Sequence, residues 1–138
     1  MNNVQSDPRV LVIEDETSVA GTLRGMLSAL GYAIAGTTSR FDEALVILDR
    51  EPIDAVVLDI DLHGTASYPI ADELAARGIP FIFSTGYGAH ILPAGYERFP
   101  LLTKPFRRAA LGEALANLLT APTSEFLSGS SRASSAQP

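Results

Sequence analysis

The sequence predicts an α/β protein built on a doubly wound parallel sheet with helices on both of its faces. Short, continuous apolar runs recur along the chain, and such runs are typical of strands that are buried on both faces. Between them lie segments whose apolar residues are three and four positions apart, as in amphipathic helices. Because the two patterns alternate, the strands should be joined by helical crossovers and therefore be parallel.

Five apolar runs are the candidate strands, and the second and fifth of them carry the weaker pattern. In chain order they are residues 10–13, 32–35, 55–58, 81–83 and 101–102. Helices are expected between these runs and after the last one, over residues 17–30, 40–50, 70–77 and 107–119. Ser39 is the expected N-cap of the second helix, and Gly31 and Gly78 are expected to stop the first and third.

Residues 87–100 interrupt this alternation of strand and helix patterns. Glycine and proline are frequent in this segment and just before it, at positions 86, 88, 93, 95 and 100. Since these residues disfavour a stable helix, the fourth helix should be short or irregular, around residues 89–92 or 94–98.

The 138 residues predict one domain, over residues 9–120, after a flexible N-terminus at residues 1–8. Residues 121–138 are rich in Ser, Ala and Pro and are expected to be disordered. Too few residues follow position 119 to fold an output domain, so we expect a single-domain protein.

Composition excludes several classes of protein. A net charge of −6 disfavours binding to nucleic acid, because an acidic domain repels phosphate backbones. The chain has no cysteine, which excludes disulfides and thiolate metal sites and is consistent with the cytoplasm. It has no signal peptide, no apolar run of the ~20 residues that a membrane span needs, and no glycine-rich nucleotide-binding motif.

Polar residues follow four of the apolar runs, and in a doubly wound sheet ligands bind beyond the carboxyl ends of the strands. These residues are Glu14, Asp15 and Glu16, then Asp59 and Asp61, then Ser84 and Thr85, and finally Thr103, Lys104 and Pro105. Each has an ordinary alternative as a turn, helix-capping or surface residue. Their joint position at one edge of the sheet favours a common site.

Crowded carboxylates need a cation, and oxygen ligands of this kind suit Mg²⁺. A metal beside Asp59 would allow this weak nucleophile to attack phosphorus and form an aspartyl phosphate. Lys104 would place a second positive charge on the phosphoryl oxygens, and Thr85 would donate a hydrogen bond to one of them.

These residues resemble the receiver domain of two-component response regulators, over roughly residues 9–119. Residues 10–16 (VLVIEDE) resemble its first strand and acidic pair, and residues 54–59 (DAVVLD) its third strand and phosphoacceptor. Thr85 falls on the hydroxyl position, and Lys104-Pro105 on the lysine with its usually cis proline. The resemblance implies a flavodoxin-like (βα)₅ fold with a five-stranded parallel sheet.

The resemblance also implies the role of each residue in a phosphorelay. Asp59 would accept a phosphoryl group from a histidine kinase or a histidine phosphotransfer protein, and the domain would catalyse only its own phosphorylation and hydrolysis. Asp15 and Asp59 would bind Mg²⁺ through their carboxylates, Glu14 through water and Asp61 through its backbone carbonyl. A switch of Thr85, Gly86, Tyr87, Lys104 and Pro105 would then alter a protein-binding surface around residues 84–106.

Three departures from the usual receiver pattern stand out. Leu101 replaces the aromatic residue three positions before the lysine, and residues 60–64 (IDLHG) lack the usual proline. Residues 80–87 (PFIFSTGY) instead resemble the signature of the stand-alone "FAT GUY" receivers, in which the segment after the Thr switches. Tyr87 is then either a switch residue or a packed loop residue, and His63 either a ligand or an exposed loop residue.

Other functions stay open from the sequence alone. The chain could drain phosphoryl groups as a sink in a relay, or bind proteins as a degenerate receiver. It could also be a phosphatase of the haloacid dehalogenase type, although the Asp-x-Asp pattern of such enzymes is absent after the first strand. We expect a monomer or a weak dimer, with a downstream partner that the sequence does not identify.

Overall fold

The structure is a computed structural model that describes residues 7–86 and 92–120. Five parallel strands form its central sheet in the spatial order β2-β1-β3-β6-β7. They are β1 (Arg9–Ile13), β2 (Ala33–Thr38), β3 (Ala55–Asp59), β6 (Phe81–Thr85) and β7 (Leu101–Thr103). The predicted α/β fold, a flavodoxin-like doubly wound sheet of five parallel strands, is therefore confirmed.

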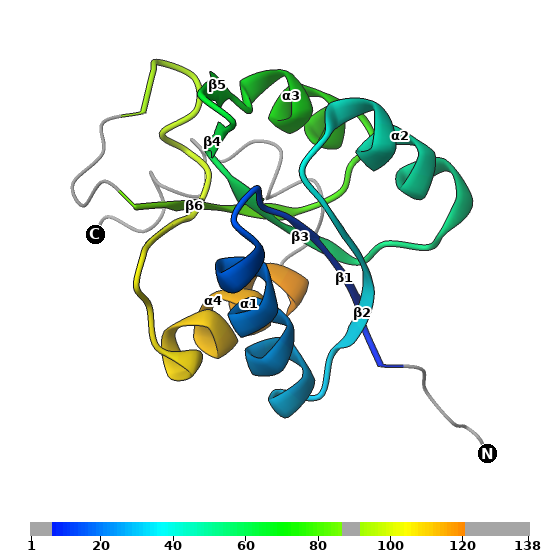
Figure 1. Ribbon diagram of the computed structural model, residues 1–138, viewed down its shortest axis with the longest axis vertical. Coiled ribbons are helices and arrows are strands. Elements are labelled where there is room, and N and C mark those ends of the chain that lie inside the picture. The colour runs from blue at the N-terminus through cyan, green and yellow to red at the C-terminus, as the bar shows by residue number, and fades with distance from the viewer. Residues whose placement is uncertain (1–6, 87–91, 121–138) are drawn as a thin grey trace.

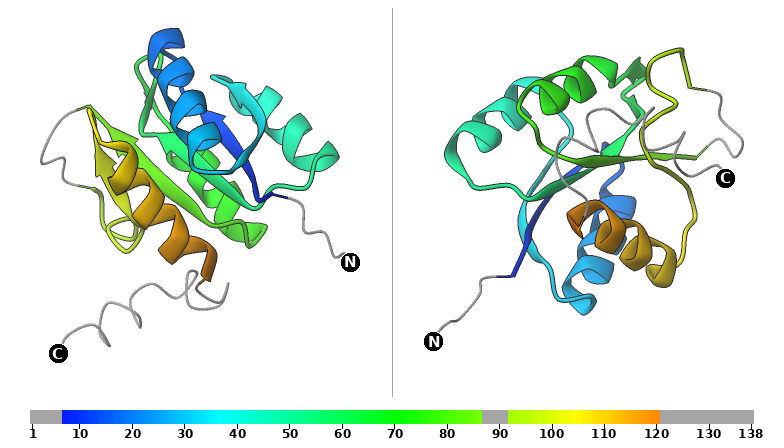
Figure 2. Two further views of the ribbon diagram at one scale, coloured as in Figure 1. Left: turned by 90° about the horizontal axis from the view of Figure 1, so that it is seen from below. Right: turned by 180° about the vertical axis from the view of Figure 1, so that it is seen from behind.

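Helices cover both faces of this sheet (Figures 1 and 2). They are α1 (Thr17–Ala29), α2 (Phe41–Arg50), α3 (Tyr68–Ala76) and α4 (Arg108–Thr120). Figure 1 shows α1 and α4 side by side on one face and α2 and α3 on the other. None of the helices in the described part of the chain combines the length and the apolar character that crossing a membrane requires.

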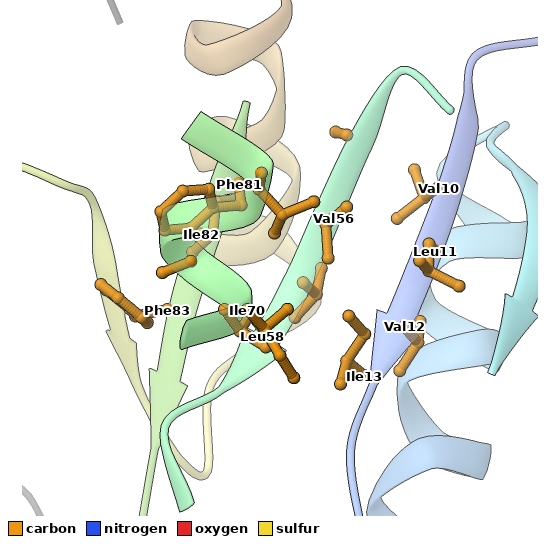
Figure 3. Packing of buried hydrophobic residues seen from close by; sticks show 14 of the residues in the cluster. Val10, Leu11, Val12, Ile13, Val56, Leu58, Ile70, Phe81, Ile82 and Phe83 are labelled. Atoms are coloured by element: carbon orange, nitrogen blue, oxygen red, sulfur yellow. The ribbon is translucent and has the colours of Figure 1, made fainter. Parts of the chain in front are cut away.

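The core lies between the helices and the three central strands. Every residue of β3 and β6 is buried, as are residues 10–13 of β1, because helices cover both faces there. Figure 3 shows the apolar side chains of these strands meeting Ile70 of α3. This burial explains why the predicted strands read as continuous apolar runs.

Some boundaries differ from the prediction. The predicted Ser39 cap is wrong: Arg40 occupies the N-cap position of α2, and its side chain makes no capping hydrogen bond. Thr38 is tied to the same turn instead, since its hydroxyl accepts a hydrogen bond from the Arg40 N–H and donates one to Glu43. Helix α3 begins at Tyr68, two residues before the predicted start, with Pro69 in its first turn.

The irregular connection before β7 is confirmed where the structure describes it. Residues 94–98 form turns rather than the alternative helix, and residues 89–91 lie outside the described residues. The Tyr96 hydroxyl donates a hydrogen bond to Asp72 of α3 at 2.8 Å, and its ring lies 4.6 Å from that of Tyr68. Phe99 is buried, with its ring 4.6 Å from that of Phe81. Aromatic contacts thus fasten this connection to α3 and β6.

A small hairpin after β3 was not predicted. Strand β4 (Asp61–Leu62) pairs antiparallel with β5 (Thr65–Ala66). The two turn residues both have positive φ, 54° at His63 and 81° at Gly64, as in a type I′ turn. The predicted terminal segments fall mostly outside the described residues, which exclude positions 1–6 and 121–138.

Candidate functional site

An acidic cluster lies at the carboxyl edge of the sheet. Glu14 and Asp15 follow β1, and Asp59 ends the neighbouring strand β3. One carboxylate oxygen from each of the three lies within 4.8 Å of the other two. A cavity of about 260 Å³ opens beside them, lined by Asp15, Glu16, Asp59, Asp61, Gly86 and Lys104. The sheet thus brings together the carboxylates that the sequence pattern singled out.

Lys104 provides the positive charge of this cluster. Its Nζ donates hydrogen bonds to Glu14 Oε1 at 3.0 Å and to Asp59 Oδ2 at 3.3 Å. Only 2% of the Glu14 side chain and 6% of the Asp59 side chain are exposed, so water screens these charges weakly. Three carboxylates against one ammonium leave two negative charges in excess when all are ionised.

Burial and the neighbouring charges change the acidity of Asp59. Burial, and then the charge of Glu14, raise the pKa of Asp59 from 3.8 to about 7, while Lys104 and the Asp61 N–H act in the opposite direction. Burial alone would lower the pKa of Lys104, but its bond to Glu14 and the charge of Asp59 outweigh burial and raise it. Lys104 is therefore held as a cation between two acids.

Asp15 is held in a different way. Its Oδ2 accepts a hydrogen bond from the backbone N–H of His63 at 2.9 Å. Burial raises the pKa of Asp15, but this bond from His63 and further hydrogen bonds outweigh burial and lower the pKa overall. The His63 imidazole is 62% exposed and its Nδ1 lies 3.8 Å from Asp15 Oδ2. Of the two alternatives for His63, the structure shows the exposed loop residue, and the sequence did not predict the contact that its backbone N–H makes.

Thr85 and Lys104 are linked through the backbone. Thr85 ends β6 and is buried, and its carbonyl accepts a hydrogen bond from the Lys104 N–H at 2.7 Å. The Lys104–Pro105 peptide bond is cis, as the resemblance implied. The role of the Thr85 hydroxyl stays a prediction, and Tyr87 lies outside the described residues.

The donor atoms fit a hard divalent cation. The cluster offers carboxylate oxygens and no softer ligand, which suits Mg²⁺. Asp61 lines the cavity, and its backbone N–H donates to Asp59 Oδ1 at 3.2 Å. The metal-binding role of the Asp61 carbonyl stays a prediction.

The family model described as the response regulator receiver domain matches residues 10–116. This chain belongs to the receiver domain family. The match decides against the haloacid dehalogenase alternative, and it agrees with the strand order and the acidic cluster described above.

Curated relatives of this receiver are longer proteins. The aerobic respiration control protein ArcA of Escherichia coli K12 is 30% identical over 119 residues, which cover 82% of this chain and 49% of ArcA. The probable transcriptional regulator ycf27 of Porphyra purpurea is 33% identical over 81 residues, which cover 58% of this chain and 33% of that protein. The receiver thus spans a third to a half of the length of these relatives.

Two solved structures resemble the receiver along most of its length. SdrG from Sphingomonas melonis Fr1 is 36% identical, with a TM-score of 0.74 over 85% of this chain and 100% of SdrG. The receiver domain of the Erythrobacter litoralis PhyR response regulator is 26% identical, with a TM-score of 0.70 over 85% of this chain and 95% of that domain. The "FAT GUY" subtype itself stays a prediction.

Proposed function

We propose that this receiver accepts a phosphoryl group on Asp59 from a histidine kinase or a histidine phosphotransfer protein. In this reaction an Asp59 oxygen attacks phosphorus, the bond between phosphorus and the donor nitrogen breaks, and the donor imidazole keeps the electron pair. The observation that carries the proposal is the Lys104 ammonium, which bridges Glu14 and Asp59 beside an open cavity. It places a fixed positive charge where phosphoryl oxygens would arrive.

A magnesium ion would be held by the carboxylates of Asp15 and Asp59, by Glu14 through water and by the Asp61 carbonyl. When bound, Mg²⁺ would withdraw charge from the phosphoryl oxygens and so assist the attack. The three carboxylates support this site, because their oxygens converge within 4.8 Å and carry an excess of negative charge. Occupation of the site would also favour the ionised, nucleophilic form of Asp59, whose pKa is otherwise raised to about 7.

Phosphorylation would then change the surface around residues 84–106. The phosphoryl group adds about −1.5 to −2 charge, and this charge would draw Lys104 and the Thr85 hydroxyl towards it. Two contacts support transmission of this change from the phosphorylation site to the surface. The Lys104 N–H is bonded to the Thr85 carbonyl, and Phe83, two residues earlier in β6, has its ring 6.1 Å from that of Phe99. Of the proposed switch residues, Gly86 and Tyr87 directly follow Thr85 in sequence, and Pro105 directly follows Lys104.

Intact-mass measurement tests the proposal. The purified protein is incubated with acetyl phosphate or a phosphorylated histidine kinase, with Mg²⁺ or with a chelator. We expect an adduct of roughly 80 Da, the mass of a phosphoryl group, only with Mg²⁺. The variant Asp59→Asn should lack the adduct, and Asp7→Asn, which removes an exposed carboxylate, should keep it. Wild-type protein that gains no adduct from either donor would leave only the role of a binding module.

A further inference from the structure

We propose that the two-residue turn at His63–Gly64 positions the Asp15 carboxylate for metal binding, through the backbone N–H of His63. The inference rests on the proposed function, because Asp15 is a ligand of the proposed magnesium site. It assigns a role to the β4–β5 hairpin, which the sequence pattern did not predict.

The geometry of the turn aims this N–H at Asp15. Asp61 pairs with Ala66 and Leu62 with Thr65, which leaves His63 and Gly64 as the two central residues of the hairpin. Both have positive φ, so the turn depends on a backbone conformation that few side chains adopt. The acceptor, Asp15, lies 48 residues earlier in the chain, after β1. The bond therefore joins the hairpin to a different strand end.

The same hairpin is also fastened to Asp59. The Asp61 N–H donates to Asp59 Oδ1 at 3.2 Å, and the hydroxyl of Ser67, the residue that follows β5, donates to the Asp59 carbonyl at 2.6 Å. One short element thus holds both carboxylates that would bind the metal directly, Asp59 at its base and Asp15 at its tip. The hairpin thereby helps to set the separation and orientation of these two ligands. Both matter because Mg²⁺ requires a near-ideal octahedral arrangement of its ligands.

The backbone, and not the imidazole, makes the close contact. The N–H lies 2.9 Å from Asp15 Oδ2, while the imidazole Nδ1 is 3.8 Å away and largely exposed. A distance of 3.8 Å is too long for a hydrogen bond. Replacement of the side chain should therefore matter less than disruption of the turn.

The experiment compares two glycines that have similar positive φ angles. Gly64 has φ 81° and Gly31, which follows α1 far from the site in sequence, has φ 92°. At either position no atom of the described residues, apart from the glycine and its two chain neighbours, would lie within 4 Å of an added Cβ, so Gly64→Ala and Gly31→Ala introduce comparable strain without a clash. The Kd for Mg²⁺ is measured for both variants and for wild type by calorimetry, with unfolding monitored alongside.

We expect Gly64→Ala to raise the Kd for Mg²⁺ roughly threefold to tenfold, since it weakens one hydrogen bond to a charged group. Gly31→Ala should leave the Kd within about twofold of wild type while destabilising the fold to a similar extent. Equal Kd values for the two variants would overturn the inference and leave the proposed function intact. Wild-type protein that does not bind Mg²⁺ at all would overturn both.

Two further measurements do not depend on Gly64→Ala folding. The His63 amide of wild-type, metal-free protein should be protected from hydrogen exchange, because it is bonded to Asp15. The conservative variant His63→Asn keeps the N–H and suits the turn, so Mg²⁺ binding should resemble that of wild type. An unprotected amide, or a tenfold loss of affinity in His63→Asn, would overturn the role of the backbone donor.

Discussion

The raised pKa of Asp59 predicts that Asp59→Asn stabilises the metal-free protein, and does so more at pH 8 than at pH 5. Burial and the neighbouring Glu14 raise the pKa of Asp59 from 3.8 to about 7. The folded state therefore binds this proton more tightly than the unfolded state does. The stability that the proton contributes is fully present below about pH 4 and is lost as the pH rises through about 7. Asparagine does not ionise, so the variant escapes this loss.

The size of the effect follows from the same two values. A shift from 3.8 to about 7, at about 1.4 kcal/mol per unit, changes the free energy of unfolding by at most about 3 kcal/mol between pH 5 and pH 8. Asp59 shares the Lys104 ammonium with Glu14, and Lys104 favours the ionised form of Asp59, so we expect the change to fall below this maximum. We therefore expect the free energy of unfolding of Asp59→Asn, relative to that of wild type, to grow by about 1–2 kcal/mol between pH 5 and pH 8.

Urea unfolding measures this quantity. Wild type, Asp59→Asn and the exposed control Asp7→Asn are unfolded at pH 5 and pH 8 with a chelator present, and the free energies are compared. The control removes the same charge away from the acidic cluster, so any general effect of net charge is subtracted. An advantage of Asp59→Asn that is no larger at pH 8 than at pH 5 would refute the reasoning. Saturating Mg²⁺ should narrow the difference at pH 8, because an ion bound at the proposed site would stabilise the folded wild type.

Three further variants test the contacts around the site. Lys104→Met removes the cation that lowers the pKa of Asp59, so labelling by acetyl phosphate, followed by intact mass, should slow at least tenfold; a change of under twofold would contradict this. Ser84→Ala removes a buried hydroxyl that lacks a hydrogen-bond partner among the described residues, and should raise the free energy of urea unfolding by about 1 kcal/mol; a loss of stability would count against it. Tyr96→Phe loses the bond to Asp72, so amides of residues 92–100 should exchange faster; unchanged exchange would show that ring packing suffices.

The fold and the acidic cluster could be predicted because both depend on burial that is visible in sequence. Strands β3 and β6 are covered on both faces, so each is a continuous apolar run that ends abruptly at a polar residue. In a parallel sheet these ends share one edge. Adjacent strands then bring Glu14, Asp15 and Asp59 together, and the chain after β7 adds Lys104.

Other features depend on contacts that leave no local pattern. Strand β2 runs to Thr38 because it pairs with β1, although Gly36 interrupts the strand pattern in its sequence. The β4–β5 hairpin has strands of two residues each, too short for alternation to be recognised. The sequence feature that marks this hairpin is the His63–Gly64 dipeptide of its turn. A glycine after a polar residue also occurs in loops that form no hairpin.

The bond between Glu14 and Lys104 shows why the roles of single residues are hard to assign from sequence. The lysine pattern suggested a partner for phosphoryl oxygens, yet the shorter of its two bonds is to Glu14, at 3.0 Å, and the longer is to Asp59. Glu14 therefore acts in two opposing ways: its charge raises the pKa of Asp59, and its bond holds the cation that lowers it. A phosphoryl group on Asp59 would compete with Glu14 for Lys104, so the strength of that bond opposes the switch. Because these effects depend on distances between three strand ends, they follow only from the folded arrangement.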